Sequence, residues 1–239
     1  GGTVAARALR AADRPPRGEE PASRRAAFEE FFYAKLARGE LRPGDVFSEL
    51  QLAHEAELNT VPVREGLLAI ARTGLVAKEP RRRWTVVRLD ARMVDELFEL
   101  RELFELHAVR AAVALPDGDP LLDQLRGILD EHAALARRPR VADFLRLDER
   151  FHRTLLACAR NRYVAEQFAT ISMLIRFQLA ENQVGERGMR LGLAAHPQVI
   201  RAVLARDVAG AERAMREHLG GAHGITLLAA GVGQPASPE

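Results

Sequence analysis

Apolar residues recur every three or four positions through most of the chain, which is the spacing of one face of an α-helix. In the first third of the sequence this pattern predicts helices at 24–38, 48–56 and 59–72. Ser48 and Asn59 precede the two shorter helices, and both residue types are favoured as N-caps because their side chains accept backbone N–H groups. Three closely spaced helices are therefore expected here.

The periodicity changes after Gly74. Two runs rich in β-branched and apolar residues, 75–80 and 84–89, flank the basic triplet Arg81, Arg82 and Arg83. Alternating runs around a turn are typical of a β-hairpin. The sequence therefore predicts a hairpin with a basic tip.

From residue 91 onward the helical period returns and persists. Turn-forming and helix-breaking residues divide this region into six predicted helices. These are expected at 91–115, 118–137, 141–160, 162–183, 189–205 and 207–230. The predicted fold class is mostly α, with an N-terminal winged helix-turn-helix that includes a small β-hairpin and a C-terminal all-α bundle of about six helices. We expect a flexible arm at 1–23, the winged helix-turn-helix at 24–90, the helical domain at 91–230 and a flexible tail at 231–239.

Composition narrows the class of protein but names no partner. The 47% of hydrophobic residues is enough for a sizeable core, and no apolar run approaches the roughly 20 residues that a membrane span needs. Cys158 is the single cysteine, so an intramolecular disulfide is excluded. A chain without disulfides suits a reducing compartment, and we expect a soluble, cytoplasmic protein with no membrane partner.

Arginine provides nearly all of the positive charge. Of 35 basic residues only Lys35 and Lys78 are lysine, while the net charge is +2. Guanidinium groups favour bidentate contacts with phosphate, guanine or carboxylate. A GC-rich genome would produce the same bias, so the arginine content alone does not indicate nucleic-acid binding.

The order of the N-terminal elements is more informative than their composition. Two short helices joined by a tight turn and followed by a basic hairpin are typical of a winged helix-turn-helix, in which the second helix enters the DNA major groove. Arg64 lies one turn into that helix, and Arg81, Arg82 and Arg83 lie at the wing. The same topology can also be only a compact way to pack three helices, so both interpretations stay open at this point.

Three motifs then resemble the DNA-binding domain of the GntR family of bacterial transcription regulators. They are Gly39-Glu-Leu-Arg-Pro-Gly44, Ser48-Glu-Leu-Gln-Leu-Ala53 and Pro62-Val-Arg-Glu-Gly-Leu67, followed by Gly74-Leu-Val76. The resemblance implies DNA binding by Ser48, Asn59, Thr60, Arg64, Arg81, Arg82 and Arg83. One departure is Asn59-Thr60-Val61, where the family usually has serine, arginine and threonine. Thr60 cannot make the bidentate guanine contact that arginine offers, so the operator sequence is expected to differ.

The helical domain contains a candidate set of metal ligands. Asp148 and His152 are four residues apart and so share one face of a predicted helix. His196 and His218 lie on two other segments, His218 on an otherwise apolar face. Three imidazoles and one carboxylate suit a divalent metal, with zinc preferred and nickel, manganese or iron as alternatives. Without further partners, the pair at 148 and 152 would be a surface pair or a hydrogen-bonded core histidine.

The same residues lie in motifs that resemble the effector-binding domain of the FadR subgroup of GntR regulators. The motifs are Asp148-Glu-Arg-Phe-His152, His196-Pro-Gln-Val-Ile200 and the segment from Asp207 to His218, with Arg101-x-x-x-Glu105 on the first helix of the bundle. The resemblance implies a helical bundle around a cavity, with Asp148, His152, His196 and His218 as metal ligands. Pro197 disfavours helical backbone at the preceding residue, so a helix is expected to begin or kink at His196. The other histidines, His54, His107, His132 and His223, are interpreted as surface or packing residues.

A small organic acid is the expected effector. A carboxylate could bind the metal through one oxygen and form charge-assisted hydrogen bonds with an arginine. Arg101 is the first candidate for this role, followed by Arg176 and Asn182. For each of them an ion pair or hydrogen bond within the bundle is an equally good interpretation.

These observations favour a ligand-responsive transcription regulator that binds operator DNA as a homodimer and is not an enzyme. Dimerisation is expected because one winged helix makes few base contacts, whereas two read a palindromic site. One alternative is a metalloenzyme with a hydrolytic His/His/His/Asp site, against which stands the absence of a dedicated nucleophile or of a His-Glu-x-x-His motif. Another is a metal- or effector-binding protein whose DNA contact has weakened, as Thr60 suggests.

Overall fold

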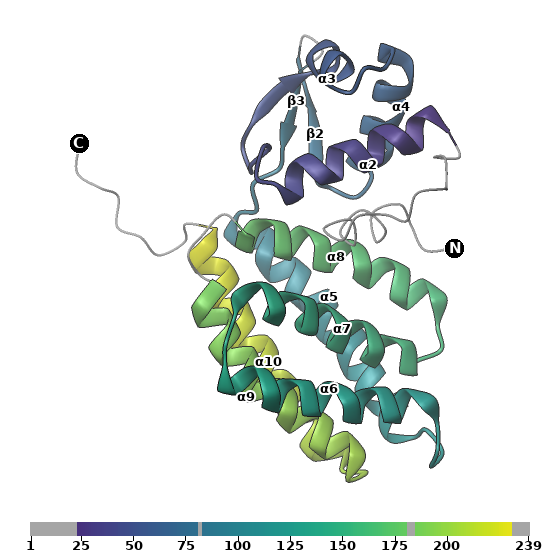
Figure 1. Ribbon diagram of the computed structural model, residues 1–239, viewed down its shortest axis with the longest axis vertical. Coiled ribbons are helices and arrows are strands. Elements are labelled where there is room, and N and C mark those ends of the chain that lie inside the picture. Colours follow the sequence, from purple (N-terminus) through teal and green to yellow (C-terminus); the bar gives the residue numbers. More distant parts are fainter. Residues whose placement is uncertain (1–22, 81–82, 181–184, 231–239) are drawn as a thin grey trace, which may run out of the picture. The chain divides into compact units, whose positions relative to one another are not determined.

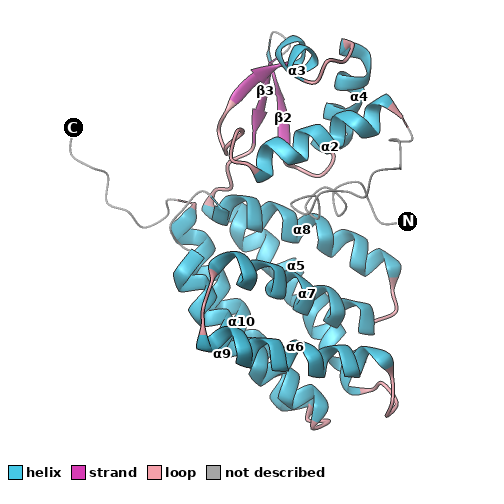
Figure 2. Cartoon of the chain, in the orientation of Figure 1, coloured by secondary structure: helices cyan, strands magenta, loops and turns pink. Residues whose placement is uncertain are grey.

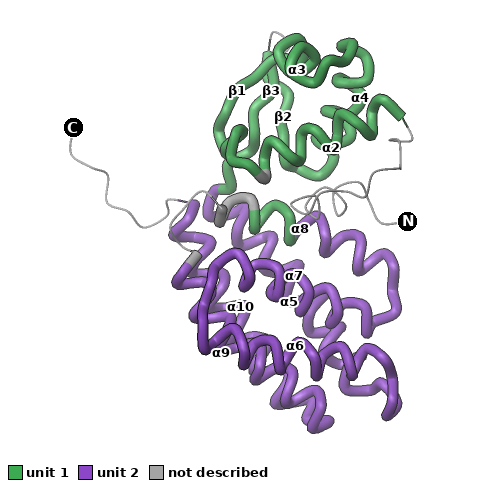
Figure 3. Tube along the Cα trace, in the orientation of Figure 1, with its two compact units in different colours: residues 1–89, 172–181 green, residues 90–171, 182–239 purple. Residues whose placement is uncertain are grey.

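The computed structural model describes residues 23–80, 83–180 and 185–230 and confirms the mostly helical fold class. The chain divides into two compact units, which Figure 3 colours separately. The first contains the chain up to Leu89 together with the stretch that begins at Ser172, and the second contains the remainder.

The first unit combines helices with a small antiparallel sheet (Figure 2). Its elements are α2 (Arg24–Ala37), β1 (Val46–Ser48), α3 (Glu49–Glu55), α4 (Thr60–Ala71), β2 (Val76–Glu79) and β3 (Arg83–Val86). The strand order is β1-β3-β2, and both pairs are antiparallel. The sequence predicted β2 and β3 but missed β1, because three residues are too few for an alternating pattern to be recognised.

The apolar residues that recur along α2 are buried in the core of this unit. Phe28 and Phe32, one turn apart on α2, are fully buried together with Trp84 of β3. Gly66 of α4 permits this packing, because a Cβ atom there would lie 2.4 Å from the Phe28 ring. The helix-turn-helix is therefore held against the sheet by an aromatic core.

The second unit is a bundle of long helices (Figure 1). They are α5 (Ala91–Val113), α6 (Pro120–Arg137), α7 (Val141–Cys158), α8 (Arg162–Ala180), α9 (Gly185–Leu204) and α10 (Val208–Ala229), with α8 continuing into the first unit. Helix α10 packs along α9 and α5, while α7 contacts α5, α6 and α9. Asp90, Asp119 and Asp207 cap the starts of α5, α6 and α10 by accepting backbone N–H groups.

Helix α9 differs from the sequence-based expectation at its start. It begins at Gly185, earlier than the expected residue 189, and it contains Pro197 as the expected range 189–205 did, so a helix start at His196 is excluded. Proline removes one backbone donor from the helix, but His196, Val199 and Ile200 are all completely buried. The packing of this face offsets the lost hydrogen bond.

Several predicted segments fall outside the described residues. These are positions 1–22 of the expected arm, the hairpin residues 81–82, positions 181–183 of the expected fourth bundle helix and the tail at 231–239. Within the described part of the chain, no helix is both long enough and apolar enough to span a bilayer.

Candidate metal centre

Three buried imidazoles from three different helices meet inside the bundle. His152 lies on α7, His196 on α9 and His218 on α10. One ring nitrogen from each lies within 4.8 Å of the other two, a spacing that a single metal ion could bridge. The structure thus brings together three of the four ligands that the sequence predicted.

Asp148 lies beside this cluster. Its Oδ1 atom is 3.7 Å from His152 Nε2 and 3.6 Å from His196 Nε2, and its side chain is 23% exposed. The i,i+4 spacing on α7 places the carboxylate next to His152, as the sequence predicted. Asp148 therefore lies close to two of the three imidazoles.

A buried carboxylate orients His152. Glu105 of α5 has no solvent exposure, and its Oε2 atom lies 2.6 Å from His152 Nδ1. Burial alone would raise the pKa of Glu105, but the Arg101 guanidinium and His152 outweigh this effect and lower the pKa to about 2. The ionised carboxylate can only accept a hydrogen, so Nδ1 of His152 is the donor, and in the neutral ring the lone pair is on Nε2, which faces the cluster.

His196 presents its Nε2 in the same way. This atom is buried and has no hydrogen-bond partner within the described structure, while Nδ1 lies 3.0 Å from Nε2 of His132. Burial, followed by the neighbouring His218 and His152, lowers the pKa of His196 well below its usual value. Burial also lowers the pKa of His218 strongly. Neutral imidazoles with free lone pairs are the form that binds metal.

The donor set fits a divalent metal. Imidazole nitrogen and carboxylate oxygen suit zinc and other first-row ions, and a buried ring nitrogen without a partner is an atom that such an ion would satisfy. His218 Nε2 lies 3.3 Å from His152 Nε2, so these two nitrogens also face the common centre. The arrangement therefore has the composition and the orientation of a metal site.

The structure places Arg101 beside the cluster. The residue is 6% exposed, and its guanidinium forms an ion pair with Glu105 at 2.7 Å and has Nη2 3.4 Å from His152 Nε2. Of the other two effector candidates, Arg176 is half-buried on α8, and Asn182 lies outside the described residues. Arg101 is thus the candidate that the geometry associates with the histidines.

The DNA-binding candidates have different local roles. Asn59 and Thr60 are exposed at the start of α4, and Arg83 is exposed at the start of β3. Ser48 caps α3 by accepting the backbone N–H of Gln51 at 3.1 Å. Arg81 and Arg82 lie outside the described residues.

Arg64 is half-exposed but not free. Its Nε donates to Oε2 of the buried Glu49 at 2.9 Å, and the other oxygen of Glu49 accepts from the Trp84 indole at 3.2 Å. This network joins α3, α4 and β3. Arg64 is therefore oriented by contacts within the protein.

Sequence reasoning missed two contributors to the metal centre. Glu105 was noted only as part of a family pattern, and His132 was interpreted as a surface or packing residue. His132 is buried and contacts His196 directly. For Glu105 the available signal was its position four residues after Arg101 on the same helix. No local pattern marked His132, because its partner His196 is 64 residues away.

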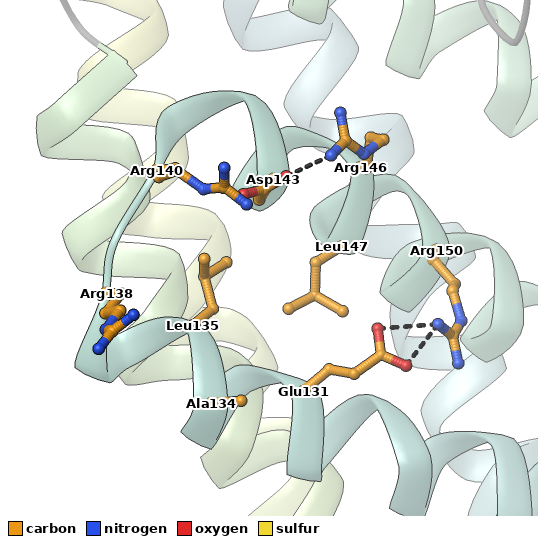
Figure 4. A pocket seen from close by; sticks show the side chains of 9 residues that line it. All are labelled: Glu131, Ala134, Leu135, Arg138, Arg140, Asp143, Arg146, Leu147 and Arg150. Atoms are coloured by element: carbon orange, nitrogen blue, oxygen red, sulfur yellow. Dashed lines mark hydrogen bonds and ion pairs between the residues drawn. The ribbon is translucent and has the colours of Figure 1, made fainter. Parts of the chain in front are cut away.

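A surface groove lies between α6 and α7, and none of the three clustered histidines is among the residues that line it. Its volume is about 810 Å³ and its floor includes Leu135 and Leu147 (Figure 4). Its rim carries Arg138, Arg140, Arg146 and Arg150 together with Glu131 and Asp143. Arg140 and Arg146 pair with Asp143, and Arg150 pairs with Glu131, so three of the four guanidinium groups already have carboxylate partners.

Comparison with known proteins identifies relatives of this chain. Residues 96–221 match the FCD domain family. The chain is 34% identical over 201 residues to the probable HTH-type transcriptional regulator LgoR of Escherichia coli K12, a match that covers 82% of this chain and 65% of LgoR. It is 33% identical to an uncharacterised HTH-type regulator from an unstable DNA locus of Streptomyces ambofaciens, covering 75% of each chain.

Solved structures share the fold. A putative GntR regulator from Rhodococcus sp. RHA1 matches with a TM-score of 0.70 at 20% identity, covering 86% of this chain and 98% of the other. McbR/YncC of E. coli matches with a TM-score of 0.65 at 21% identity, covering 83% and 94%. The curated relatives are transcriptional regulators by name. The chain belongs to the family of HTH-type transcriptional regulators that carry an FCD domain.

Proposed function

We propose that this chain is a metal-dependent, effector-responsive transcription regulator of the FadR subgroup, which acts in the cytoplasm as a homodimer on operator DNA. The observation that carries the proposal is the meeting of His152, His196 and His218 in the interior of the FCD domain. A domain that only needed a stable core would bury apolar residues at these positions, because unpaired buried polar atoms are costly.

The resident ion is a divalent metal held by the three imidazoles and Asp148, with zinc preferred. Zinc is favoured by nitrogen-rich sites, and nickel, manganese and iron accept the same ligands. When bound, the ion supplies a Lewis-acidic position for an oxygen ligand. Glu105 holds the His152 ring in place, so the site is preorganised.

The effector is a small organic acid whose carboxylate reaches the metal position and Arg101. The Arg101 guanidinium lies next to the cluster, and a guanidinium and carboxylate form strong charge-assisted hydrogen bonds. Arg101 already pairs with Glu105, which fixes its position. Arg176 and Asn182 stay weaker candidates for effector contacts.

Operator recognition is assigned to the start of α4 and to the wing. Asn59 and Thr60 offer exposed polar groups to base edges, and Arg64 of the same helix is oriented by its ion pair with Glu49. Arg81, Arg82 and Arg83 provide positive charge for contacts with the DNA backbone. Ser48 supports α3 from its cap position. Two such modules in a homodimer would read two half-sites.

The test combines metal analysis with DNA binding. Protein purified without chelators or metal-affinity steps should contain about one metal ion per chain, and removal of the ion should abolish the response of DNA binding to small carboxylates. His218→Ala should remove the metal, whereas His107→Ala, at an exposed position on α5, should leave it bound. Metal-free wild-type protein whose DNA affinity still responds to carboxylates would contradict the proposal.

A further inference from the structure

We infer that His132 is a positioning residue, which fixes the tautomer of His196 and so aims the lone pair of His196 Nε2 at the metal position. The inference rests on the metal site proposed above. His132 lies on α6, a helix that contributes no ligand in the described structure. Its role is therefore exerted through another side chain.

A backbone carbonyl fixes the tautomer of His132. Nδ1 of His132 lies 2.8 Å from the carbonyl oxygen of Ile128, one turn earlier on α6. A carbonyl oxygen can only accept, so Nδ1 of His132 carries the hydrogen. In a neutral imidazole the other nitrogen, Nε2, is then an acceptor.

The tautomer of His132 in turn determines the tautomer of His196. His132 Nε2 lies 3.0 Å from His196 Nδ1, and because Nε2 accepts, Nδ1 of His196 must donate. His196 is then left with a lone pair on Nε2. That nitrogen is buried, has no hydrogen-bond partner within the described structure and lies 3.6 Å from the carboxylate of Asp148.

Packing alone cannot make this choice. The His196 ring stacks between Phe151, at a centroid distance of 4.2 Å, and Phe144, at 6.0 Å. These aromatic rings hold the plane of the imidazole but do not distinguish its two tautomers, since neither offers a strong donor or acceptor. The hydrogen bond from His196 to His132 is the described contact that does.

His152 is oriented by a hydrogen bond of the same kind. Glu105 accepts the Nδ1 hydrogen of His152 and leaves the lone pair on its Nε2. Two ligands from two helices are thus set by two outer acceptors, one a carboxylate and one an imidazole. Outer partners of this kind orient metal-binding histidines and raise their basicity, and their loss typically weakens metal affinity about 10- to 100-fold.

The first test observes the tautomer without any metal. Long-range ¹H–¹⁵N NMR spectra of the metal-free protein distinguish an imidazole that is protonated on Nδ1 from one protonated on Nε2. We expect His196 in the Nδ1–H form in the wild type and in His132→Gln, whose side-chain oxygen can still accept, and loss of this preference in His132→Leu. An Nε2–H form in the wild type would overturn the inference.

The second test measures Co²⁺ affinity by chelator competition, with the absorption spectrum of the bound ion as a second readout. His132→Leu should bind Co²⁺ about 10- to 100-fold more weakly than the wild type, and His132→Gln should recover much of the loss. Phe144→Leu is the packing control, because it loosens the contact with His196 but keeps the hydrogen bond. His107→Leu controls for removal of an exposed histidine from the bundle.

The outcomes separate this inference from the proposed function. A wild type that binds no Co²⁺ would overturn the metal site and, with it, any role of His132 toward a metal. A wild type that binds Co²⁺ no more tightly than His132→Leu would overturn the role of His132 alone. A loss in Phe144→Leu as large as in His132→Leu would show that packing, and not the hydrogen bond, positions His196.

Discussion

At the scale of single residues, buried polar groups in this protein obtain defined partners from distant parts of the chain. Glu49 is the example in the first unit: it is 5% exposed and accepts hydrogens from both Arg64 and Trp84. Its removal would leave the indole N–H of a fully buried tryptophan without an acceptor. Residues of this kind set the stability of the helix-turn-helix as well as the orientation of its arginine.

Glu49→Ala should therefore lower the free energy of unfolding by about 1–3 kcal/mol, the usual cost of an unsatisfied buried donor. Glu49→Gln should cost less, since its amide oxygen can still accept from Trp84. Urea denaturation followed by tryptophan fluorescence measures both values, because Trp84 is the only tryptophan. Equal losses in the two variants would mean that the indole hydrogen bond is not the relevant interaction.

Cys158 provides a prediction for alkaline pH. Burial, followed by the charge of Asp119, raises the pKa of its thiol to about 11, whereas an unfolded cysteine titrates near 8.5. The unfolded state thus loses its proton first, and stability should fall as pH rises from about 9 to about 11, with a contribution of up to about 1.4 kcal/mol per pH unit from this group. Below pH 8 the thiol should contribute no pH dependence.

Cys158→Ala and Cys158→Ser should both flatten this alkaline slope, whatever they do to stability at neutral pH. Urea unfolding at several pH values between 8 and 10.5 would measure it. Tyr33, whose pKa burial raises to about 12, stays in both variants and accounts for a residual slope above pH 10. A slope unchanged in both variants would show that the thiol does not titrate differently in the two states.

At the scale of elements, the sequence predicted the helices well because they carry sustained apolar faces and several have a recognisable start. Asp90, Asp119 and Asp207 mark three of these starts with side-chain caps. The failures are β1, which is too short to show a period, and the first turn of α9, which begins at Gly185 and not at residue 189. Helix α9 contains Pro197, as its predicted range did, because its buried face outweighs one missing hydrogen bond. Local pattern thus fixes most elements, whereas packing decides the exceptions.

In the candidate metal centre, too, some residues could be predicted from the sequence and others depend on packing. Asp148 and His152 could be paired from their spacing, and His196 and His218 from family resemblance. The hydrogen bonds from His152 to Glu105 and from His196 to His132 join residues 47 and 64 positions apart. Such contacts depend on how helices pack, which no local period encodes.

Close packing between two elements gives a prediction for Gly192. A Cβ atom at this position of α9 would lie 2.4 Å from the Phe144 ring of α7 and 3.3 Å from His196. Gly192→Ala should therefore destabilise the bundle by about 1–3 kcal/mol through overpacking. Gly188→Ala is the matched control on the same helix, because its Cβ would meet nothing within 4 Å.

Thermal or urea unfolding of these two variants would measure the effect, and Gly188→Ala should be neutral or slightly stabilising, since alanine favours helix. The double variant Gly192→Ala with Phe144→Leu should recover part of the loss, because the smaller side chain removes the clash. Equal stability of the two glycine variants would contradict the close approach of α9 and α7.

At the scale of the whole molecule, the proposed metal would connect segments that the chain keeps far apart. His152, His196 and His218 come from α7, α9 and α10, and Asp148 adds a second group from α7. A ligand that binds only the folded state stabilises it by mass action, about 2.7 kcal/mol at a free concentration 100 times the Kd. In the unfolded chain these donors are dispersed, so the folded state should bind the ion much more tightly.

Metal removal should accordingly lower the melting temperature, and the size of the shift should increase with the logarithm of free metal concentration in the titration that reverses it. His196→Ala and His218→Ala should each abolish this dependence, whereas His54→Ala, at an exposed position of α3 outside the bundle, should keep it. Differential scanning calorimetry across a series of buffered Zn²⁺ concentrations makes the measurement. A melting temperature that depends on Zn²⁺ equally in wild type and in His218→Ala would place the ion elsewhere, because removing one of three converging imidazoles cannot leave the binding free energy of this centre unchanged.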